Sequence, residues 1–126
     1  MKILYVEDDA LIAEVAKNLF LTTDYKIIFS QTIANAIHVV NNCGKCLDVI
    51  ILDLHLSDGY GIELIRDIER KKIKIPVIIT SGFCEDFSNE LNKYKTSGVV
   101  KHIIYKPFGI DELLFQLKDI ENSLVK

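Results

Sequence analysis

Short apolar runs alternate with amphipathic segments along the whole chain. The runs are rich in β-branched residues and occupy positions 2–6, 25–29, 47–52, 75–82 and 99–105. Short, uninterrupted apolar runs of this kind are typical of strands that are covered on both faces. Between the runs, apolar residues recur at the three- and four-residue spacing of helices. The pattern therefore predicts a β-α unit repeated five times.

The expected helices have recognisable beginnings and ends. Asp9 is the expected N-cap of a helix over about 10–21. Ser30 or Thr32 should cap a second helix, which the turn-forming residues 41–46 bring to an end. These caps place each helix directly after a predicted strand.

The second half of the chain predicts three more helices. One is expected over about 62–72, after a loop at 57–61. Residues 83–97 carry a thin apolar stripe and predict a marginal helix that ends at Gly98. The last helix is marked by five apolar residues at helical spacing: Leu113, Leu114, Leu117, Ile120 and Leu124.

Strict alternation of strands and helices predicts the α/β fold class. We expect a doubly wound, five-stranded parallel sheet with right-handed crossovers, helices on both faces and a flavodoxin-like (βα)5 order. The sequence shows no internal repeat, low-complexity stretch or linker. We therefore expect residues 1–126 to form one domain, a usual length for one.

Composition and charge narrow the class of protein. Hydrophobic residues make up 49% and charged residues 26% of the chain, as in soluble globular proteins. The net charge of −3 gives no sequence-wide basic field, so neither nucleic acid nor a membrane is expected as a direct partner. The N-terminus lacks the features of a signal peptide, and three cysteines predict no disulfide framework. A cytoplasmic location is the expectation.

Polar residues follow four of the five predicted strands at the point where each strand ends. Glu7, Asp8 and Asp9 follow the first strand, and Asp53 follows the third. The other two groups are the hydroxyls of residues 80–81 and the ammonium of Lys106. The carboxyl ends of parallel strands lie at one edge, which is where such sheets bind ligands. Asp53 taken alone could equally cap the next turn, but a cap requires none of the other groups.

This grouping suits phosphoryl chemistry. Carboxylates that converge would repel one another unless a hard divalent cation lay among them, and oxygen ligands of this kind suit Mg²⁺. The cation would spread charge over phosphoryl oxygens, while Lys106 pairs with one oxygen and Ser81 donates to another. Asp53 would then act as a nucleophile and become an aspartyl phosphate.

The same residues carry a family resemblance over essentially the whole chain. The motifs are Val6-Glu7-Asp8-Asp9, Asp53 with Gly61 eight positions later, the run 76–82 and Lys106-Pro107-Phe108. Each motif is weak alone, but all of them occur in order and at suitable separations. The chain resembles the receiver domain of two-component response regulators.

The resemblance implies a role for each site residue. Asp53 would accept a phosphoryl group from a phosphohistidine on a sensor histidine kinase or phosphotransfer protein. Mg²⁺ would be held by Asp8 and Asp53 directly, by Glu7 through water and by the backbone carbonyl of His55. Ser81 matches the switch hydroxyl of the family, and Lys106 matches its lysine, which precedes a cis proline bond.

The resemblance also implies the partners. Besides the phosphodonor, a downstream effector protein is expected on the face made by the fourth helix, the fifth strand and the fifth helix. A phosphorylation-dependent homodimer is a further expected assembly. The domain would catalyse its own phosphorylation and slow dephosphorylation and is not expected to be an enzyme towards other substrates.

Two positions and one spacing depart from the family pattern, and a further position bears on the lifetime of the phosphoryl group. Ser57 stands where proline is common, and Ile103 stands where the family has an aromatic switch residue. The spacing from Gly98 to Lys106 is one residue longer than usual, which predicts a different loop before the fifth strand. Phe83, two residues after Ser81, is predicted to hinder the attacking water and slow hydrolysis of the phosphoryl group.

Two other function classes compete. A phosphohydrolase of the haloacid dehalogenase type would carry a second Asp two residues after the nucleophile, where this chain has His55. A flavodoxin-like cofactor binder would need a hydroxyl-rich loop where Glu7, Asp8 and Asp9 stand, and their charges would repel a phosphate. Both classes share the predicted topology, and fold alone does not determine function.

Other suggestive residues predict no site. Cys43 and Cys46 form a CxxC that follows a helix, whereas a redox pair of that type begins one. The segment 59–61 lacks the later glycine of a dinucleotide loop. His38 is expected on a helix surface, no ligand role is assigned to the side chains of His38 or His102, and Asp58 is expected to be a turn residue.

Overall fold

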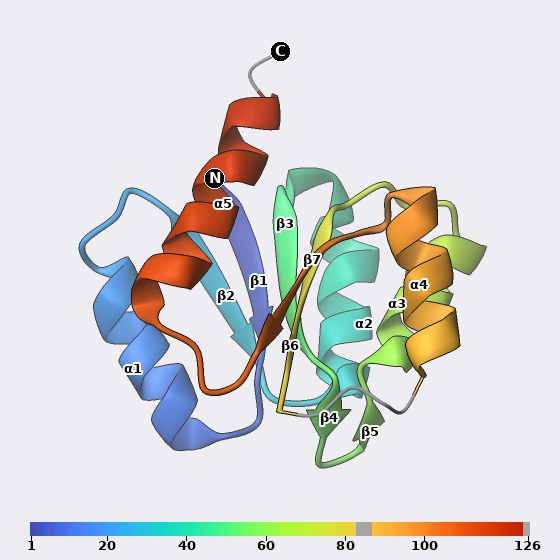
Figure 1. Cartoon of the computed structure of the whole chain (residues 1–126), viewed down its shortest axis with the longest axis horizontal. Helices are drawn as coiled ribbons and strands as arrows, with labels where there is room; N and C mark the ends of the chain where they lie inside the picture. Colours follow the sequence, from blue (N-terminus) through green and yellow to red (C-terminus); the bar gives the residue numbers. More distant parts are fainter. Residues whose placement is uncertain (83–86, 125–126) are drawn as a thin grey trace.

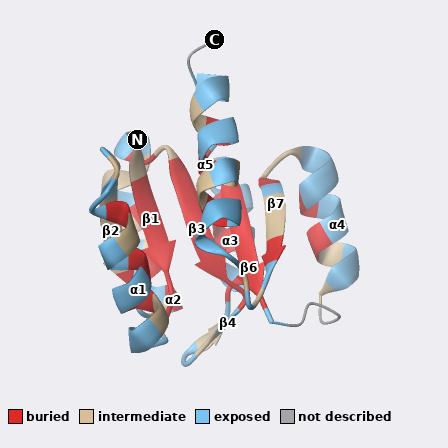
Figure 2. Ribbon diagram, turned by 60° about the vertical axis from the view of Figure 1, so that its left-hand side comes forward, coloured by how far each residue is buried: buried red, intermediate tan, exposed pale blue. Residues whose placement is uncertain are grey.

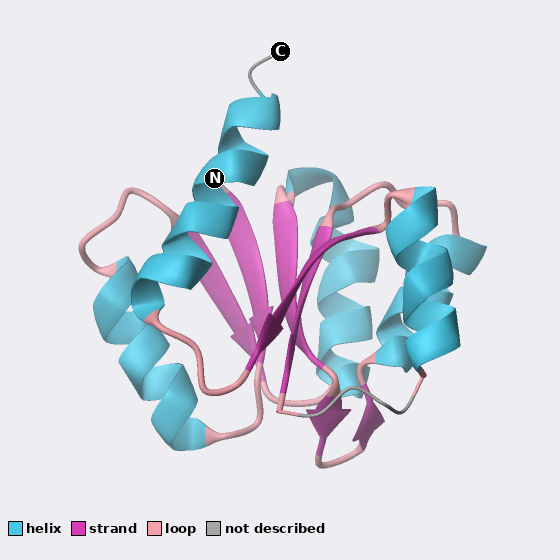
Figure 3. Cartoon of the chain, in the orientation of Figure 1, coloured by secondary structure: helices cyan, strands magenta, loops and turns pink. Residues whose placement is uncertain are grey.

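Five parallel strands form the centre of the protein, with helices on both sides (Figure 1; Figure 3). This computed structural model describes residues 1–82 and 87–124. The strands lie in the order β2-β1-β3-β6-β7. Their bounds are Lys2–Val6 for β1, Lys26–Ser30 for β2, Val49–Asp53 for β3, Val77–Ser81 for β6 and Val100–Tyr105 for β7. The predicted doubly wound parallel sheet is confirmed.

The helices follow the strands as the pattern predicts. They are α1 (Ala10–Phe20), α2 (Ile33–Cys43) with a short 3-10 helix at Gly44–Cys46, α3 (Ile62–Arg70), α4 (Ser88–Ser97) and α5 (Ile110–Leu124). Asp9 caps α1 by accepting from the backbone N–H groups of Leu11 and Ile12. Of the two residues predicted as the possible cap of α2, Thr32 is the N-cap, and its side chain accepts from the N–H of Asn35.

The sheet has an apolar core on each face. On one face, residues of β1 and β3 pack with α1 and α5, as Tyr5 does with Phe20. On the other face, alternate residues of the same strands pack with α2, α3 and α4. Every residue of β3 and β6 is buried, and these strands appear as the buried centre in Figure 2. Burial on both faces explains why their sequences read as unbroken apolar runs.

The segment predicted as a loop at 57–61 includes the turn and the second strand of a small antiparallel hairpin, so that prediction was wrong in part. Strands β4 (His55–Leu56) and β5 (Gly59–Tyr60) pair with each other and stand apart from the main sheet. The side chain of Glu63 accepts from the backbone N–H of Tyr60 at 2.9 Å, which ties the hairpin to the first turn of α3. Two-residue strands carry too little periodicity to be recognised from sequence.

Asp58, at the tip of this hairpin, does more than the turn role predicted for it. Its carboxylate accepts from the backbone N–H groups of Ile33 at 2.9 Å and Ala34 at 3.2 Å. These are the first two residues of α2, whose N–H groups have no partner within the helix. The two bonds lower the pKa of Asp58. Asp58 therefore supports α2 together with Thr32.

The extra residue before Lys106 is accommodated inside a strand, whereas the sequence predicted a change in the preceding loop. Val77 pairs with Val100 and Ile78 pairs with His102, so Lys101 has no opposite residue in β6. Such an irregularity lets one strand carry an added residue without shifting the rest of the register. Beyond it, the pairing is regular to Ser81 and Tyr105.

Other boundaries moved by a few residues. The third helix ends at Arg70, two residues earlier than predicted, and the predicted turn at 41–46 is divided between α2 and the 3-10 helix. The marginal helix begins at Ser88, and residues 83–86 lie outside the described residues. Among the helices that the structure describes, none has the length and apolar character needed to cross a bilayer.

Candidate functional site

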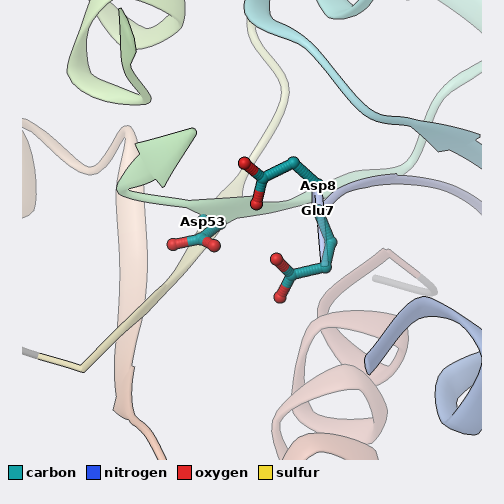
Figure 4. Close-up of side chains that lie close together, drawn as sticks. All are labelled: Glu7, Asp8 and Asp53. Atoms are coloured by element: carbon teal, nitrogen blue, oxygen red, sulfur yellow. The ribbon is translucent and has the colours of Figure 1, made fainter. Parts of the chain in front are cut away.

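Three carboxylates meet at the edge of the sheet where β1 and β3 end. Glu7 and Asp8 directly follow β1, and Asp53 is the last residue of β3. The two strands pair in parallel up to Val6 and Leu52, so their ends coincide. One ligand oxygen from each of the three carboxylates lies within 4.8 Å of the others. Figure 4 shows the three side chains close together. The predicted grouping of Glu7, Asp8 and Asp53 is thus present in the structure.

The sheet order explains why a site forms here. The chain runs from β1 outward to β2, then crosses back to β3 on the other side of β1. This reversal leaves a crevice at the carboxyl ends of β1 and β3, which is the usual ligand position in such sheets. Asp9 takes no part in the cluster that the structure shows, because its side chain caps α1.

Lys106 reaches the carboxylates from the end of β7. Its ammonium donates to Glu7 Oε1 and to Asp53 Oδ2, both at 2.9 Å. The backbone N–H of Lys106 donates to the carbonyl of Ser81 at 2.7 Å, which holds the lysine beside the end of β6. The bond between Lys106 and Pro107 is cis, as the resemblance implies.

The protonation of the site reflects burial and crowding. Glu7 is 2% exposed, and burial, together with the neighbouring carboxylate of Asp53, raises its pKa to about 7, against the lowering effect of Lys106. Burial lowers the pKa of Lys106, but its bonds to Glu7 and Asp53 outweigh that effect and raise it overall. Burial thus favours the neutral form of Glu7, while the two carboxylates favour the charged form of Lys106.

The donor set fits a hard divalent cation. Three carboxylates share one ammonium, which contacts two of them, so a net negative charge remains in a largely buried place. Oxygen donors with few protein carboxylates match Mg²⁺, which keeps part of its water shell. The backbone N–H of His55 donates to Asp53 Oδ1 at 3.1 Å. That its carbonyl completes the metal site remains a prediction.

The two hydroxyl residues at the end of β6 are both fully buried. Thr80 pairs in register with Asp53, and Ser81 is the next residue. The Thr80 hydroxyl has no hydrogen-bond partner among the described residues. The assignment of the switch role to Ser81 remains a prediction, as does the effect of Phe83, which lies outside the described residues.

Gly61 supports the site more directly than its place in a motif indicates. Its backbone N–H donates to the carbonyl of Leu54 at 2.7 Å. A Cβ at this position would overlap the carbonyl oxygen of Asp53. A glycine eight positions after a carboxylate gives no sign of such contact, which arises because the β4–β5 hairpin turns the chain back onto β3.

The remaining candidate residues lie apart from the carboxylates or have side chains that cannot bind a metal or react. Cys43 is the last residue of α2 and Cys46 the last residue of the 3-10 helix that follows, and both are free thiols. His38 is exposed on α2, as predicted. His102 lies 3.2 Å from a carboxylate oxygen of Asp119 on α5. Ile103 is half-buried against the core, so an aliphatic side chain fills the position where the family has an aromatic one.

Comparisons with known proteins agree with this geometry. The family model described as "Response regulator receiver domain" matches residues 3–118. Among curated proteins, the transcriptional regulatory protein KdpE of Staphylococcus aureus is 35% identical over 126 residues, which cover 95% of this chain and 49% of KdpE. The cell cycle transcriptional regulator CtrA of Caulobacter vibrioides is 29% identical over 121 residues, covering 93% of this chain and 48% of CtrA. The chain spans about half the length of these relatives.

Solved structures show the same architecture. The receiver domain of Francisella response regulator 1452 superposes with a TM-score of 0.83 at 28% identity and covers 98% of both chains. TrrA of Thermotoga maritima, solved in complex with Mg²⁺ and BeF, gives a TM-score of 0.78 over 94% of this chain and 97% of that one. At 23% identity, this second likeness shows the fold alone.

Proposed function

Because the chain belongs to the response regulator receiver family, we propose that Asp53 is its phosphoacceptor in a Mg²⁺-dependent reaction. The proposal rests on the cluster of Glu7, Asp8 and Asp53, together with the 2.9 Å hydrogen bond that the Lys106 ammonium donates to Asp53. Receiver domains act in two-component signalling, and the family match displaces the phosphohydrolase and flavodoxin-like alternatives. We further propose that residues 1–126 form one such domain.

The proposed reaction moves a phosphoryl group from nitrogen to oxygen. A carboxylate oxygen of Asp53 attacks the phosphorus of a phosphohistidine on the donor protein. The P–O bond forms as the P–N bond breaks, and the donor imidazole leaves and takes up a proton. The product is an acyl phosphate on Asp53. The mechanism is almost entirely positioning and charge stabilisation, which the donor set of this site can supply.

Each remaining residue has a defined task in this proposal. Mg²⁺, held by Asp8, Asp53, the His55 carbonyl and Glu7 through water, would offset the negative charge that develops on the phosphoryl oxygens. Lys106, already bonded to Asp53, pairs with one of these oxygens, and Ser81 donates to another. Slow attack of water on the acyl phosphate resets the domain. The chain is therefore a switch that acts on itself.

The proposed partners follow from this role. A sensor histidine kinase or phosphotransfer protein supplies the phosphoryl group, in the cytoplasm. An effector protein, or a second copy of the chain, binds the face formed by α4, β7 and α5. Tyr105 on β7 is 58% exposed on the described surface and gives this face an aromatic contact. The names of the relatives indicate transcriptional control, and we propose that phosphorylation of Asp53 serves a process of this kind.

The test is phosphorylation by a small donor followed by intact mass measurement. The protein is incubated with Mg²⁺ and acetyl phosphate or phosphoramidate. We expect the gain of one phosphoryl group, lost in Asp53→Asn and kept in Asp24→Asn, which makes the same change at an exposed aspartate. Absence of the gain with both donors, or its survival in Asp53→Asn, would overturn the assignment.

A further inference from the structure

Three aromatic rings form a continuous row beside the phosphoacceptor. The ring of His55 on β4 lies 5.5 Å from that of Tyr60 on β5, with an angle of 75° between the planes. The ring of Tyr60 lies 5.1 Å from that of Phe87, at 65°. Both contacts have the edge-to-face geometry that aromatic pairs favour. The row joins the β4–β5 hairpin to the residue that precedes α4, and Figure 1 shows these segments near each other at the same edge of the sheet.

Phe87 has an unfavourable backbone conformation. It is the N-cap of α4, with φ 65° and ψ 16°, and its side chain makes no capping hydrogen bond. The left-handed region crowds the Cβ of any residue except glycine, and a bulky residue is rare there. A helix can still begin at this point, because the carbonyl of Phe87 accepts from the N–H of Leu91 at 2.8 Å. Contacts of the Phe87 side chain must therefore offset the backbone strain.

The structure shows these contacts on two sides of the phenylalanine. Tyr60 packs on it from the hairpin, and the guanidinium of Arg66 on α3 lies 5.9 Å from the centre of its ring. Arg66 in turn forms two 2.7 Å bonds with the carboxylate of Glu90 in the first turn of α4. The start of α4 is thus held from outside the helix. An element held in this way can respond when one of its supports moves.

The other end of the row is bonded to the phosphoacceptor. The backbone N–H of His55 donates to the carboxyl oxygen Oδ1 of Asp53 at 3.1 Å. When Asp53 becomes an acyl phosphate, its own two oxygens become a carbonyl oxygen and a bridging oxygen, which accept hydrogen bonds less strongly than a carboxylate does. The phosphorylated and free states therefore differ in how they hold His55, which is the differential interaction that a switch requires.

We propose that the His55–Tyr60–Phe87 row carries the phosphorylation state of Asp53 to the start of α4, with Tyr60 as the positioning residue. The inference rests on the proposed function of Asp53 and adds the route by which its state is read. A weaker bond to His55 lets the hairpin move, Tyr60 shifts with it, and Phe87 loses part of the support that offsets its backbone strain. The route needs no aromatic residue at position 103, where this chain has an aliphatic side chain.

Amide hydrogen exchange of residues 88–97 tests this route. The protein is measured with Mg²⁺ alone and with Mg²⁺ and acetyl phosphate, and intact mass on the same samples gives the phosphorylated fraction. Edge-to-face aromatic contacts correspond to about a twofold to tenfold change in a local opening equilibrium. We expect phosphorylation to change the exchange of α4 within this range. Tyr60→Phe, which keeps the ring, should respond in the same way.

Two further variants remove the ring of Tyr60. A third variant, at another exposed aromatic residue, is the control for the loss of a ring as such. Tyr60 is 46% exposed, so Tyr60→Ala and Tyr60→Leu are expected to fold and to become phosphorylated, but without the change in α4. Phe115→Ala, at a 71% exposed ring on α5, should respond like the parent. An equal response of α4 in either ring-deleted variant, or no response in phosphorylated parent protein, would overturn the route. Absence of phosphorylation in the parent would instead overturn the proposed function, and the route with it.

Discussion

Replacing Lys106 by methionine should lower the free energy of unfolding of the metal-free protein more than replacing an exposed lysine does. The ammonium donates to Glu7 and to Asp53, whose side chains are 1% and 7% exposed. Methionine keeps most of the length of the side chain but leaves two buried carboxylates facing each other without a cation. A buried charge that loses its partner is strongly destabilising because its desolvation is no longer compensated.

The size of the effect follows from the two contacts. At 2.9 Å, Coulomb attraction amounts to about 6 kcal/mol for each pair at an effective dielectric constant of about 20. Desolvation of the ammonium offsets much of this, and removing one partner of a buried pair typically costs about 3–5 kcal/mol. Lys106 is 21% exposed, and Glu7, whose pKa is about 7, can take up a proton in the variant. We therefore expect a loss of about 2–4 kcal/mol in the free energy of unfolding.

Urea unfolding at neutral pH, with EDTA and with excess Mg²⁺, measures this loss. The cation should bind Lys106→Met more tightly than the parent, because no ammonium competes for the carboxylates, and binding to the folded state stabilises it. The loss should thus be smaller with Mg²⁺. Lys26→Met, at an exposed lysine on β2, is the matched control and should be near neutral. A loss equal to that of the control, or one that Mg²⁺ leaves unchanged, would refute the reasoning.

Three further predictions concern the supports of the site. Asp58→Ala should lower the free energy of unfolding by about 1 kcal/mol at neutral pH. Because the folded-state pKa of Asp58 is lowered, the difference should vanish as the pH falls through that pKa, below about 4, and a pH-independent difference would contradict the capping role. Gly61→Ala should lower the free energy of unfolding by about 1–3 kcal/mol and slow phosphorylation by acetyl phosphate. Gly109→Ala is the control, because a Cβ there would meet open space. Equal effects of the two changes would count against the close approach of Gly61 to the carbonyl of Asp53. Arg66→Ala should speed amide exchange in α4 about twofold to fivefold through loss of the paired bonds to Glu90, and unchanged exchange would show that this pair does not hold the helix.

The main elements could be predicted because their signals are local. Unbroken apolar runs mark β3 and β6, since both faces of these strands are covered, and the capping side chains of Asp9 and Thr32 act within three residues of their own positions. The order of strands and helices then implies that β1 and β3 end at the same edge of the sheet, which brings Glu7 and Asp53 together there. The site was predictable to that extent because parallel strands bring their carboxyl ends together.

What the sequence by itself determined is therefore the set of strands and helices, the edge at which they end and the identity of the charged groups there. The tertiary structure decided how those groups are paired. Glu7 and Lys106 are 99 residues apart, and nothing local indicates that the ammonium bonds to Glu7 as well as to Asp53, or that burial raises the pKa of Glu7.

The supports of the site also belong to the tertiary structure. Asp58 caps a helix 25 residues earlier in the chain, Lys101 is accommodated as an extra residue within a strand, and the row of rings joins a two-residue strand to the start of α4. Each depends on where the sheet places segments that are distant along the chain. Periodicity reports which face of an element is buried, whereas contacts across the fold depend on the register and packing of the whole sheet.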